Sequence, residues 1–270
     1  MSERRDWLRL CVGLLCAPAV VTLALFAAPL VALRPQLADL ASFSGAASVA
    51  LMSLVIAVPA KVPMRVALGA AVLTGAALGA LAVFQASLGA GATLVAVDTV
   101  LVVLAWALGG SLGKSVQHQA HLFPACVVAA SADVVSLLSP EGPSHAVAAS
   151  ERALSVLAIW FPVPGTRESS PALGVGDLVF IAFVLGVAVA HQLDYKRAIA
   201  CCVAGVVLAG FAAAALGVAV PALVPIAAAT IIGLPSIRKL RRADRRAAHV
   251  SMLVAGSIAV ATIARTAARF

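Results

Sequence analysis

The sequence predicts an all-α protein, a polytopic transmembrane helical bundle, from two observations. Of its 270 residues, 63% are hydrophobic and 11% are charged, whereas soluble domains are about half apolar and about one-quarter charged. The apolar residues also gather in about nine runs, each close to the ~20 residues that a helix needs to cross a bilayer. This composition excludes a water-soluble globule and a disordered chain.

Charged residues, proline or glycine bound the predicted spans. They cover residues 8–32, 44–60, 65–86, 91–112, 122–139, 172–192, 197–218, 220–236 and 248–266. We expect one membrane domain over residues 1–270. It comprises N-terminal helices (1–121), a part with the candidate site (122–236), and a basic loop with a last helix (237–270). Residues 140–171 are the one long connection, with a short interfacial or re-entrant helix expected around 153–163.

The first apolar run follows Arg4 and Arg5, as a signal peptide would. It is longer than a typical signal-peptide core, and further spans follow, so we interpret it as the first membrane span. The five cysteines all lie in apolar runs without a C-x-x-C spacing, which predicts small hydrophobic residues rather than disulfides or ligands. They are Cys11, Cys16, Cys126, Cys201 and Cys202.

The positions of lysine and arginine predict the orientation, because their translocation is disfavoured. With a cytoplasmic N-terminus, the 19 Lys and Arg residues fall in cytoplasmic segments, except Arg34, Arg152, Arg167, Arg265 and Arg269. The C-terminus and the 140–171 connection are then extracytoplasmic. The net charge of +8 indicates lipid headgroups as partners, not nucleic acid. The Ala-, Val- and Arg-rich usage is typical of a high-GC bacterium, so the expected location is the bacterial inner membrane.

Three acidic residues inside the predicted spans are the candidate functional residues: Asp98, Asp133 and Asp177. A charge at the bilayer centre costs at least about 2.5–3.5 kcal/mol on insertion scales. Asp133 lies deep in its span. Asp177 lies about one and a half turns into the next, after two glycines that permit close backbone approach and an unwound helix start. Two carboxyl groups on consecutive spans suggest a shared site.

Two facing carboxyl groups can form an aspartic dyad, in which one is held protonated and the other activates a water as a base. The alternative is that each aspartate only hydrogen-bonds across helices or lines an ion path. For Asp98 an interhelical hydrogen bond is the favoured interpretation, ahead of a role in hydrating or tuning the dyad.

Three segments resemble the presenilin and signal peptide peptidase family of intramembrane aspartyl proteases. The stretch from Asp133 to Pro143, with its Pro-x-Gly-Pro turn, resembles the segment of the first catalytic aspartate. Gly174-Val175-Gly176-Asp177 resembles the Gly-x-Gly-Asp motif, and Pro221-Ala222-Leu223 resembles the Pro-Ala-Leu motif. The three occur in the family's order and cover about residues 122–236. The Pro-Ala-Leu triplet is weak alone, since Pro171-Ala172-Leu173 repeats it.

The resemblance implies an intramembrane aspartic endopeptidase that uses Asp133 and Asp177 and needs no metal, cofactor or obligatory subunit. Its substrate would be a transmembrane segment or a signal-peptide remnant. The family implies that the unwound substrate is held as an added strand, on backbone around residues 166–175 and 220–224. Pro221 and Pro225 lack an N–H, which could leave carbonyl groups free there; an ordinary kinked helix start is an equal alternative.

The chain also departs from the family pattern. Ser131-Ala132 precede Asp133 where the family usually has Tyr, which puts rate and substrate preference in doubt. The aspartates fall on the fifth and sixth predicted spans, one earlier than in presenilin, and an extra span follows the Pro-Ala-Leu triplet. The implied orientation is that of signal peptide peptidase. The connection between the aspartates lacks the long loop that presenilin cleaves, so a single uncleaved chain is expected.

Other classes stay open. A secondary transporter could use Asp133 and Asp177 as proton or cation carriers, although no inverted repeat is visible. A prepilin-type peptidase typically has Lys shortly after Gly-x-Gly-Asp, and Leu178-Val179-Phe180 argue against it. A non-catalytic homologue is the third alternative. His118 and His121 have a metal-like spacing without a third ligand, which favours a plain loop. Gly75-x-x-x-Gly79 and Gly109-x-x-x-Gly113 predict helix-packing contacts.

Overall fold

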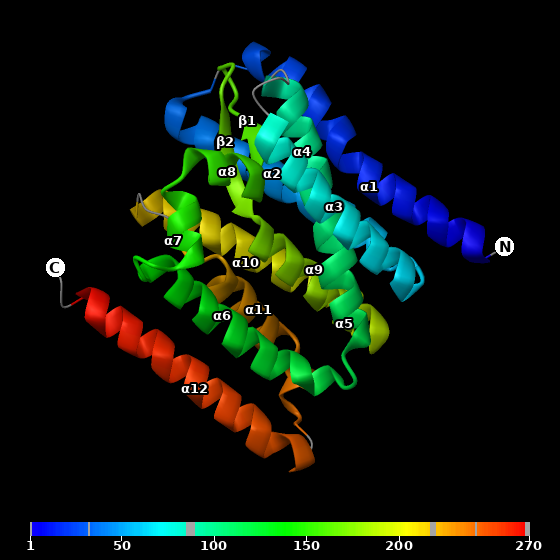
Figure 1. The fold of residues 1–270 in the computed structure, drawn as a ribbon, viewed down its shortest axis with the longest axis vertical. Coiled ribbons are helices and arrows are strands. Elements are labelled where there is room, and N and C mark those ends of the chain that lie inside the picture. Colours follow the sequence, from blue (N-terminus) through cyan, green and yellow to red (C-terminus); the bar gives the residue numbers. More distant parts are fainter. Residues whose placement is uncertain (1, 32, 85–89, 217–219, 241, 268–270) are drawn as a thin grey trace. The chain divides into compact units, whose positions relative to one another are not determined.

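The predicted helical class is confirmed: the chain is 82% helical. The computed structural model describes residues 2–31, 33–84, 90–216, 220–240 and 242–267 (Figure 1). Within these residues, seven helices are long and apolar enough to cross a membrane: Arg4–Leu30, Leu37–Ala57, Met64–Phe84, Gly91–Ser115, Gln119–Leu138, Tyr195–Leu216 and Asp244–Thr266. Two further apolar helices, Val175–Ala190 and Leu223–Gly233, are shorter. The number of spans stays a prediction.

The chain divides into two compact units. The first comprises residues 1–114 and 152–189, and the second comprises residues 115–151 and 190–270. Asp98 and Asp177 therefore belong to the first unit, and Asp133 belongs to the second.

The first unit is built on long helices and a hairpin. Its elements are α1 (Ser2–Ala27), η1 (Ala28–Leu30), α2 (Pro35–Ala57), α3 (Met64–Phe84), α4 (Ala90–Ala105), the π-helical turn η3 (Trp106–Gly110), α5 (Ser111–Ser115), α8 (Glu151–Leu157), β1 (Ala158–Pro162), β2 (Ser169–Gly174) and α9 (Val175–Ala190). The long helices follow from uninterrupted apolar runs that satisfy their own backbone hydrogen bonds. Pro35 lies in the first turn of α2, where its missing N–H costs nothing.

The expected helix around residues 153–163 is wrong in part. Helix α8 ends at Leu157, and the strand β1 takes the following residues. The physical reason is local composition, since Ile159, Trp160 and Phe161 are β-branched or aromatic residues that favour a strand, and Pro162 then ends it.

Strands β1 and β2 form an antiparallel hairpin with one irregularity. Ile159 pairs with Leu173, but Trp160 pairs with Pro171, so Ala172 is an extra residue in β2. Such a bulge bends its strand and is common beside active sites. Helix α2 holds the hairpin: the Ser42 hydroxyl donates to the Phe161 carbonyl oxygen at 2.8 Å and lies 2.9 Å from the Ser170 hydroxyl.

Helix α9 is packed tightly because glycines face it. A Cβ atom on Gly109 would collide with the Val179 backbone, and one on Gly113 would collide with the Phe183 carbonyl oxygen. The predicted packing role of the Gly109–Gly113 pair is therefore confirmed. The Gly75–Gly79 pair on α3 is different, since a Cβ there would meet no described atom within 4 Å. The packing contact predicted for it is not formed within the described chain.

The second unit surrounds the helix that carries Asp133. Its elements are η4 (Gln119–His121), α6 (Leu122–Leu138), α7 (Pro143–Ala148), α10 (Tyr195–Leu216), α11 (Leu223–Gly233), η5 (Pro235–Arg238) and α12 (Arg242–Ala267). Helix α10 approaches α11 closely at Gly205, where a Cβ would overlap the Ile226 backbone. Helix α11 is shorter than the predicted 220–236 run because η5 begins at Pro235, soon after its end.

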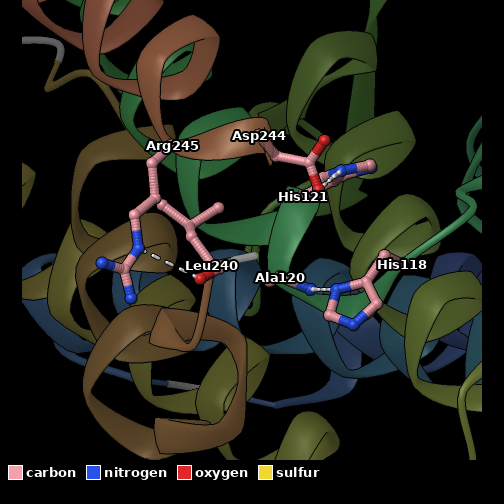
Figure 2. Close-up of polar contacts among 6 residues, drawn as sticks. All are labelled: His118, Ala120, His121, Leu240, Asp244 and Arg245. Carbon is pink, nitrogen blue, oxygen red and sulfur yellow. Dashed lines mark hydrogen bonds and ion pairs between the residues drawn. The ribbon is translucent and has the colours of Figure 1, made fainter. Parts of the chain in front are cut away.

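Helices α6 and α12 run side by side and are joined near their N-terminal ends (Figure 1). Figure 2 shows this junction, where His121 Nε2 lies 3.4 Å from Asp244 Oδ2. The His118 ring caps its own turn by accepting the Ala120 N–H at 3.1 Å. Ala120 also packs with Leu240 in a small apolar cluster. Among the described residues, no group of three His, Cys, Asp or Glu side chains could hold a metal ion.

Alanine substitutions in the two glycine pairs should have opposite effects on the stability of the protein. Gly113→Ala should lower the stability by about 1–3 kcal/mol, because the new methyl group overpacks against the α9 backbone. Gly75→Ala makes the same change in open space and should leave stability unchanged or raise it by up to about 1 kcal/mol, because alanine favours helix. Thermal unfolding midpoints in one detergent measure both. Equal destabilisation by the two variants would contradict the packing described for Gly113.

Candidate functional site

Asp133 lies in α6 and binds the Pro-Ala-Leu turn. Its Oδ2 accepts the backbone N–H of Leu223 at 3.1 Å, a contact between residues 90 positions apart in the chain. Leu223 is the first residue of α11, and Ala222 before it offers no side-chain cap. The first N–H groups of a helix have no partner inside the helix, and its N-terminus favours a negative charge. The half-buried Asp133 carboxyl group therefore supplies the cap that the sequence of α11 lacks.

The carbonyl oxygens of Pro221 and Ala222 in this turn both accept hydrogen bonds. With no N–H on Pro225, the Pro221 carbonyl oxygen accepts from Val224 N at 3.3 Å, and the Ala222 carbonyl oxygen accepts from Ile226 N at 3.3 Å. The expectation of free carbonyl groups is not met at these two residues, and the alternative of a distorted helix start describes them better.

The chain turns sharply between the end of α6 at Leu138 and the start of α7 at Pro143. The Ser136 hydroxyl accepts the Ser144 N–H at 2.8 Å, and it lies 2.7 Å from the Ser144 hydroxyl. Gly142 sits against the Ser136 backbone so closely that a Cβ would overlap its carbonyl oxygen. Only glycine fits there, which gives the Pro-x-Gly-Pro pattern of the sequence a physical reason.

Asp177 lies in the first turn of α9, nearer the helix start than the predicted one and a half turns. The difference arises because β2 occupies residues up to Gly174, so the helix begins only at Val175. Asp177 Oδ2 accepts the Gly174 N–H at 3.1 Å. A side chain at the third helical position that reaches back to the N-cap N–H is one half of a capping box.

The two glycines of the Gly-x-Gly-Asp segment are not required by a strained backbone. Neither has a positive φ. A Cβ on Gly174 would make ordinary contact with Asp177 Oδ2, and one on Gly176 would meet no described atom within 4 Å. Gly176 is exposed, so the backbone at this helix start is open to close approach.

The predicted site residues thus form two half-sites. Asp133 with Pro221, Ala222 and Leu223 lies in the second unit, and Asp177 with Gly174, Val175 and Gly176 lies in the first. The structure brings the members of each half-site together by a hydrogen bond between the carboxylate and a motif N–H. The pairing of the two carboxyl groups stays a prediction.

Asp98 does not make the interhelical hydrogen bond that was favoured for it. It lies in α4 with 1% of its surface exposed, and its Oδ1 accepts the backbone N–H of Trp160 in β1 at 3.0 Å. The partner is therefore a strand, which the sequence interpretation had placed in a helix.

An apolar groove lies between α1 and α4 in the first unit, with a volume of about 770 Å³. Leu25 and Phe26 of α1 and Val95 of α4 line it. Thr22 and Thr99 also face it, but their hydroxyl groups donate to carbonyl oxygens of their own helices at 2.6 Å. The lining is therefore apolar in character although it includes two threonines.

Sequence reasoning missed three contributors to these sites: Ser42, Trp160 and the β1–β2 hairpin itself. The aromatic and β-branched run at residues 159–161 was the available signal for a strand. Ser42 had no signal of its own, because a serine in an apolar helix is commonly a small packing residue.

Comparisons with protein-family models, with curated proteins and with solved structures find no match to this chain.

The Asp133 contact predicts a difference between two substitutions. Asp133→Ala leaves the Leu223 N–H without its acceptor, which should cost about 1–3 kcal/mol. Asp133→Asn keeps an amide oxygen at the same reach and should retain most of the stability. Thermal unfolding in detergent compares the two variants with the unaltered protein. Equal midpoints for Ala and Asn would show that the hydrogen bond contributes nothing.

Proposed function

We propose that this chain is an intramembrane aspartic endopeptidase of the presenilin and signal peptide peptidase type. The observation that carries the proposal is the hydrogen bond between Asp133 and Leu223. Two segments chosen from the sequence only by their resemblance to this family, the aspartate segment and the Pro-Ala-Leu triplet, are joined by it. A chance likeness of short motifs gives no reason for the two to meet.

In the proposed fold nine helices cross the membrane, including the short α9 and α11, in a presenilin-like order with α12 added after the Pro-Ala-Leu turn. The N-terminus is cytoplasmic, and the C-terminus is extracytoplasmic, in a bacterial inner membrane. Lysine and arginine positions support this orientation. The extra helix α12 packs along α6, so it belongs to the same unit as Asp133.

The mechanism needs the two carboxyl groups close enough to share one proton, since like charges at short range cannot both ionise. The ionised aspartate takes a proton from a water, and the water oxygen attacks the carbonyl carbon of the substrate peptide bond. The protonated aspartate donates to the carbonyl oxygen, and the departing amine receives a proton as the bond breaks. In each half-site a backbone N–H orients one carboxylate oxygen.

The hairpin supports a way of holding an unwound substrate. A helical substrate must open before its carbonyl groups can be reached, and the exposed polar groups then need partners. In the described residues β2 pairs with β1 on one edge only, so its other edge is available to an added strand. Strand β2 leads directly into Asp177, which lies three residues after Gly174. A substrate strand added to β2 would therefore lie next to Asp177.

The groove between α1 and α4 fits the part of the substrate that stays helical. Its lining is apolar, as a transmembrane segment requires, and α4 also holds β1 through Asp98. Helix α4 would therefore contact the helical part of the substrate and also hold the hairpin to which the extended part is added. Ala132, at the position where the family usually has Tyr, is exposed, so that contribution to the site is missing here.

The test of the function is peptide cleavage by the purified protein with a model transmembrane peptide. Asp133→Asn and Asp177→Asn keep the acceptors for Leu223 and Gly174, so they preserve the local structure while removing the acid–base groups. Each should lower the rate by at least about a hundredfold, the usual range for loss of general acid–base catalysis. Asp194→Asn, the same change at an exposed acid that caps α10, is the control and should cleave normally.

Cleavage retained by either dyad variant would refute the catalytic pair. No cleavage by the unaltered protein, together with proton-coupled uptake into liposomes that Asp133→Asn abolishes, would replace the proposal with a transporter. No activity in either assay would favour a non-catalytic homologue.

The orientation predicts cysteine labelling from opposite sides. In a variant with the five native cysteines replaced by alanine, Arg167→Cys lies in the exposed loop between β1 and β2, and Lys61→Cys lies in the exposed loop between α2 and α3. A membrane-impermeant maleimide added to whole cells should label Arg167→Cys, and should label Lys61→Cys only after permeabilisation. The reverse pattern would show that the chain is inserted the other way round.

A further inference from the structure

Asp98 is the one acidic or basic side chain that is buried in the part of the chain that the structure describes, with 1% exposed. Its only contact there is the hydrogen bond that Oδ1 accepts from Trp160 N at 3.0 Å, and Oδ2 has no hydrogen-bond partner among the described residues. A carboxyl group inside an apolar helix is costly. In this structure the Asp98 carboxyl group provides an acceptor for one N–H group of strand β1.

The contact falls at the irregular point of the hairpin. Trp160 is the β1 residue at which the pairing shifts, opposite Pro171 and beside the extra residue Ala172. The Trp160 ring is held too, since its Nε1 donates to the Leu154 carbonyl oxygen at 3.2 Å. One residue is thus fixed through both its backbone and its side chain.

These contacts are compatible with one position of β1. Successive N–H groups of a strand point to opposite sides, so a slip by one residue would turn the N–H away from Asp98. A slip by two residues in one direction would place Pro162 there, and proline has no N–H. Any slip would also move the Phe161 carbonyl oxygen away from the Ser42 hydroxyl of α2. Asp98 therefore selects the register of β1 against α4.

The register of β1 is transmitted to Asp177 through the hairpin. Ala158, two residues before Trp160, pairs with Gly174 at the end of β2. The Gly174 N–H in turn donates to Asp177 Oδ2. The path from Asp98 through β1 and β2 to Asp177 lies entirely within the first unit.

We propose that Asp98 is a positioning residue that holds the β1–β2 hairpin in register with Asp177, and thereby sets which peptide bond of an added substrate strand is cut. The inference rests on the proposed function for its second half. Its first half, the anchoring of the hairpin, stands on the contacts of Asp98 and Trp160 alone. The two halves have separate measurements.

The test compares three variants of the full-length protein in detergent. Asp98→Leu fills a similar volume without an acceptor, and Asp98→Asn keeps an acceptor oxygen. Val102→Ala is the matched control, since Val102 is buried one turn further along α4 and its truncation disturbs packing without removing the bond to Trp160. Backbone hydrogen exchange is followed in residues 158–162 and 169–174, and mass spectrometry of the products locates the cut.

With Asp98→Leu, the exchange rate of the hairpin should rise by about tenfold or more, because the buried Trp160 N–H loses its acceptor. Exchange in α10, in the other unit, should not change. The products should show new cuts one or two residues from the original one. Asp98→Asn should resemble the unaltered protein in both measurements, and Val102→Ala should lower the overall rate without moving the cut.

An unchanged exchange rate in the hairpin of Asp98→Leu would show that Asp98 does not anchor the hairpin. An unchanged cleavage position would show that Asp98 does not set which peptide bond is cut. If Asp98→Leu does not fold, Asp98→Thr replaces it, because a threonine hydroxyl can bond to its own helix as Thr99 does and is too short to reach Trp160. Absence of cleavage by the unaltered protein would refute the proposed function. The exchange rates would then decide the anchor by themselves.

Discussion

Every backbone N–H that leaves regular structure inside a bilayer must find an acceptor, because no water is there to provide one. Three acidic side chains of the predicted spans accept such N–H groups in this chain. Asp98 accepts from β1, Asp133 accepts from the first residue of α11, and Asp177 accepts from the end of β2. Each of these irregular segments, namely the hairpin and the starts of α9 and α11, therefore has an N–H group paired with a carboxyl group of its own unit. Two of them, Asp133 and Asp177, are also the groups that we propose for the acid–base chemistry.

Local composition predicted the helices well, because an apolar run long enough to span a membrane has few other structures available to it. It did not predict the hairpin. Residues 153–163 are apolar except for Ser155, and a short apolar run does not distinguish a strand from a helix. The partner of Asp98 was missed for a related reason, since Trp160 is 62 residues away and was expected in a helix. The sequence singled out Asp133 and Leu223 separately, by motif, and the hydrogen bond between them is a finding of the structure.

Identical sequence patterns have different meanings in different places. Both Gly-x-x-x-Gly pairs predict packing, but only Gly109 and Gly113 face a neighbouring backbone. The two Pro-Ala-Leu triplets differ as well. In the second triplet, the Leu223 N–H at the start of α11 donates to Asp133. The first triplet lies in β2, and its Ala172 is the bulge residue. Spacing and composition do not separate these cases, because the distinction is made by long-range neighbours.

The two short apolar helices carry a consequence for the lipid around them. Helix α11 has 11 residues and α9 has 16, so at 1.5 Å per residue they measure about 17 Å and 24 Å, against a hydrocarbon layer of about 30 Å. If α9 and α11 cross the membrane as proposed, each produces a hydrophobic mismatch, which lipids relieve by thinning locally. Asp177 lies on one of these helices and Asp133 binds the start of the other. For the proposed protease, thinned and hydrated lipid beside such a helix would supply the water that hydrolysis consumes.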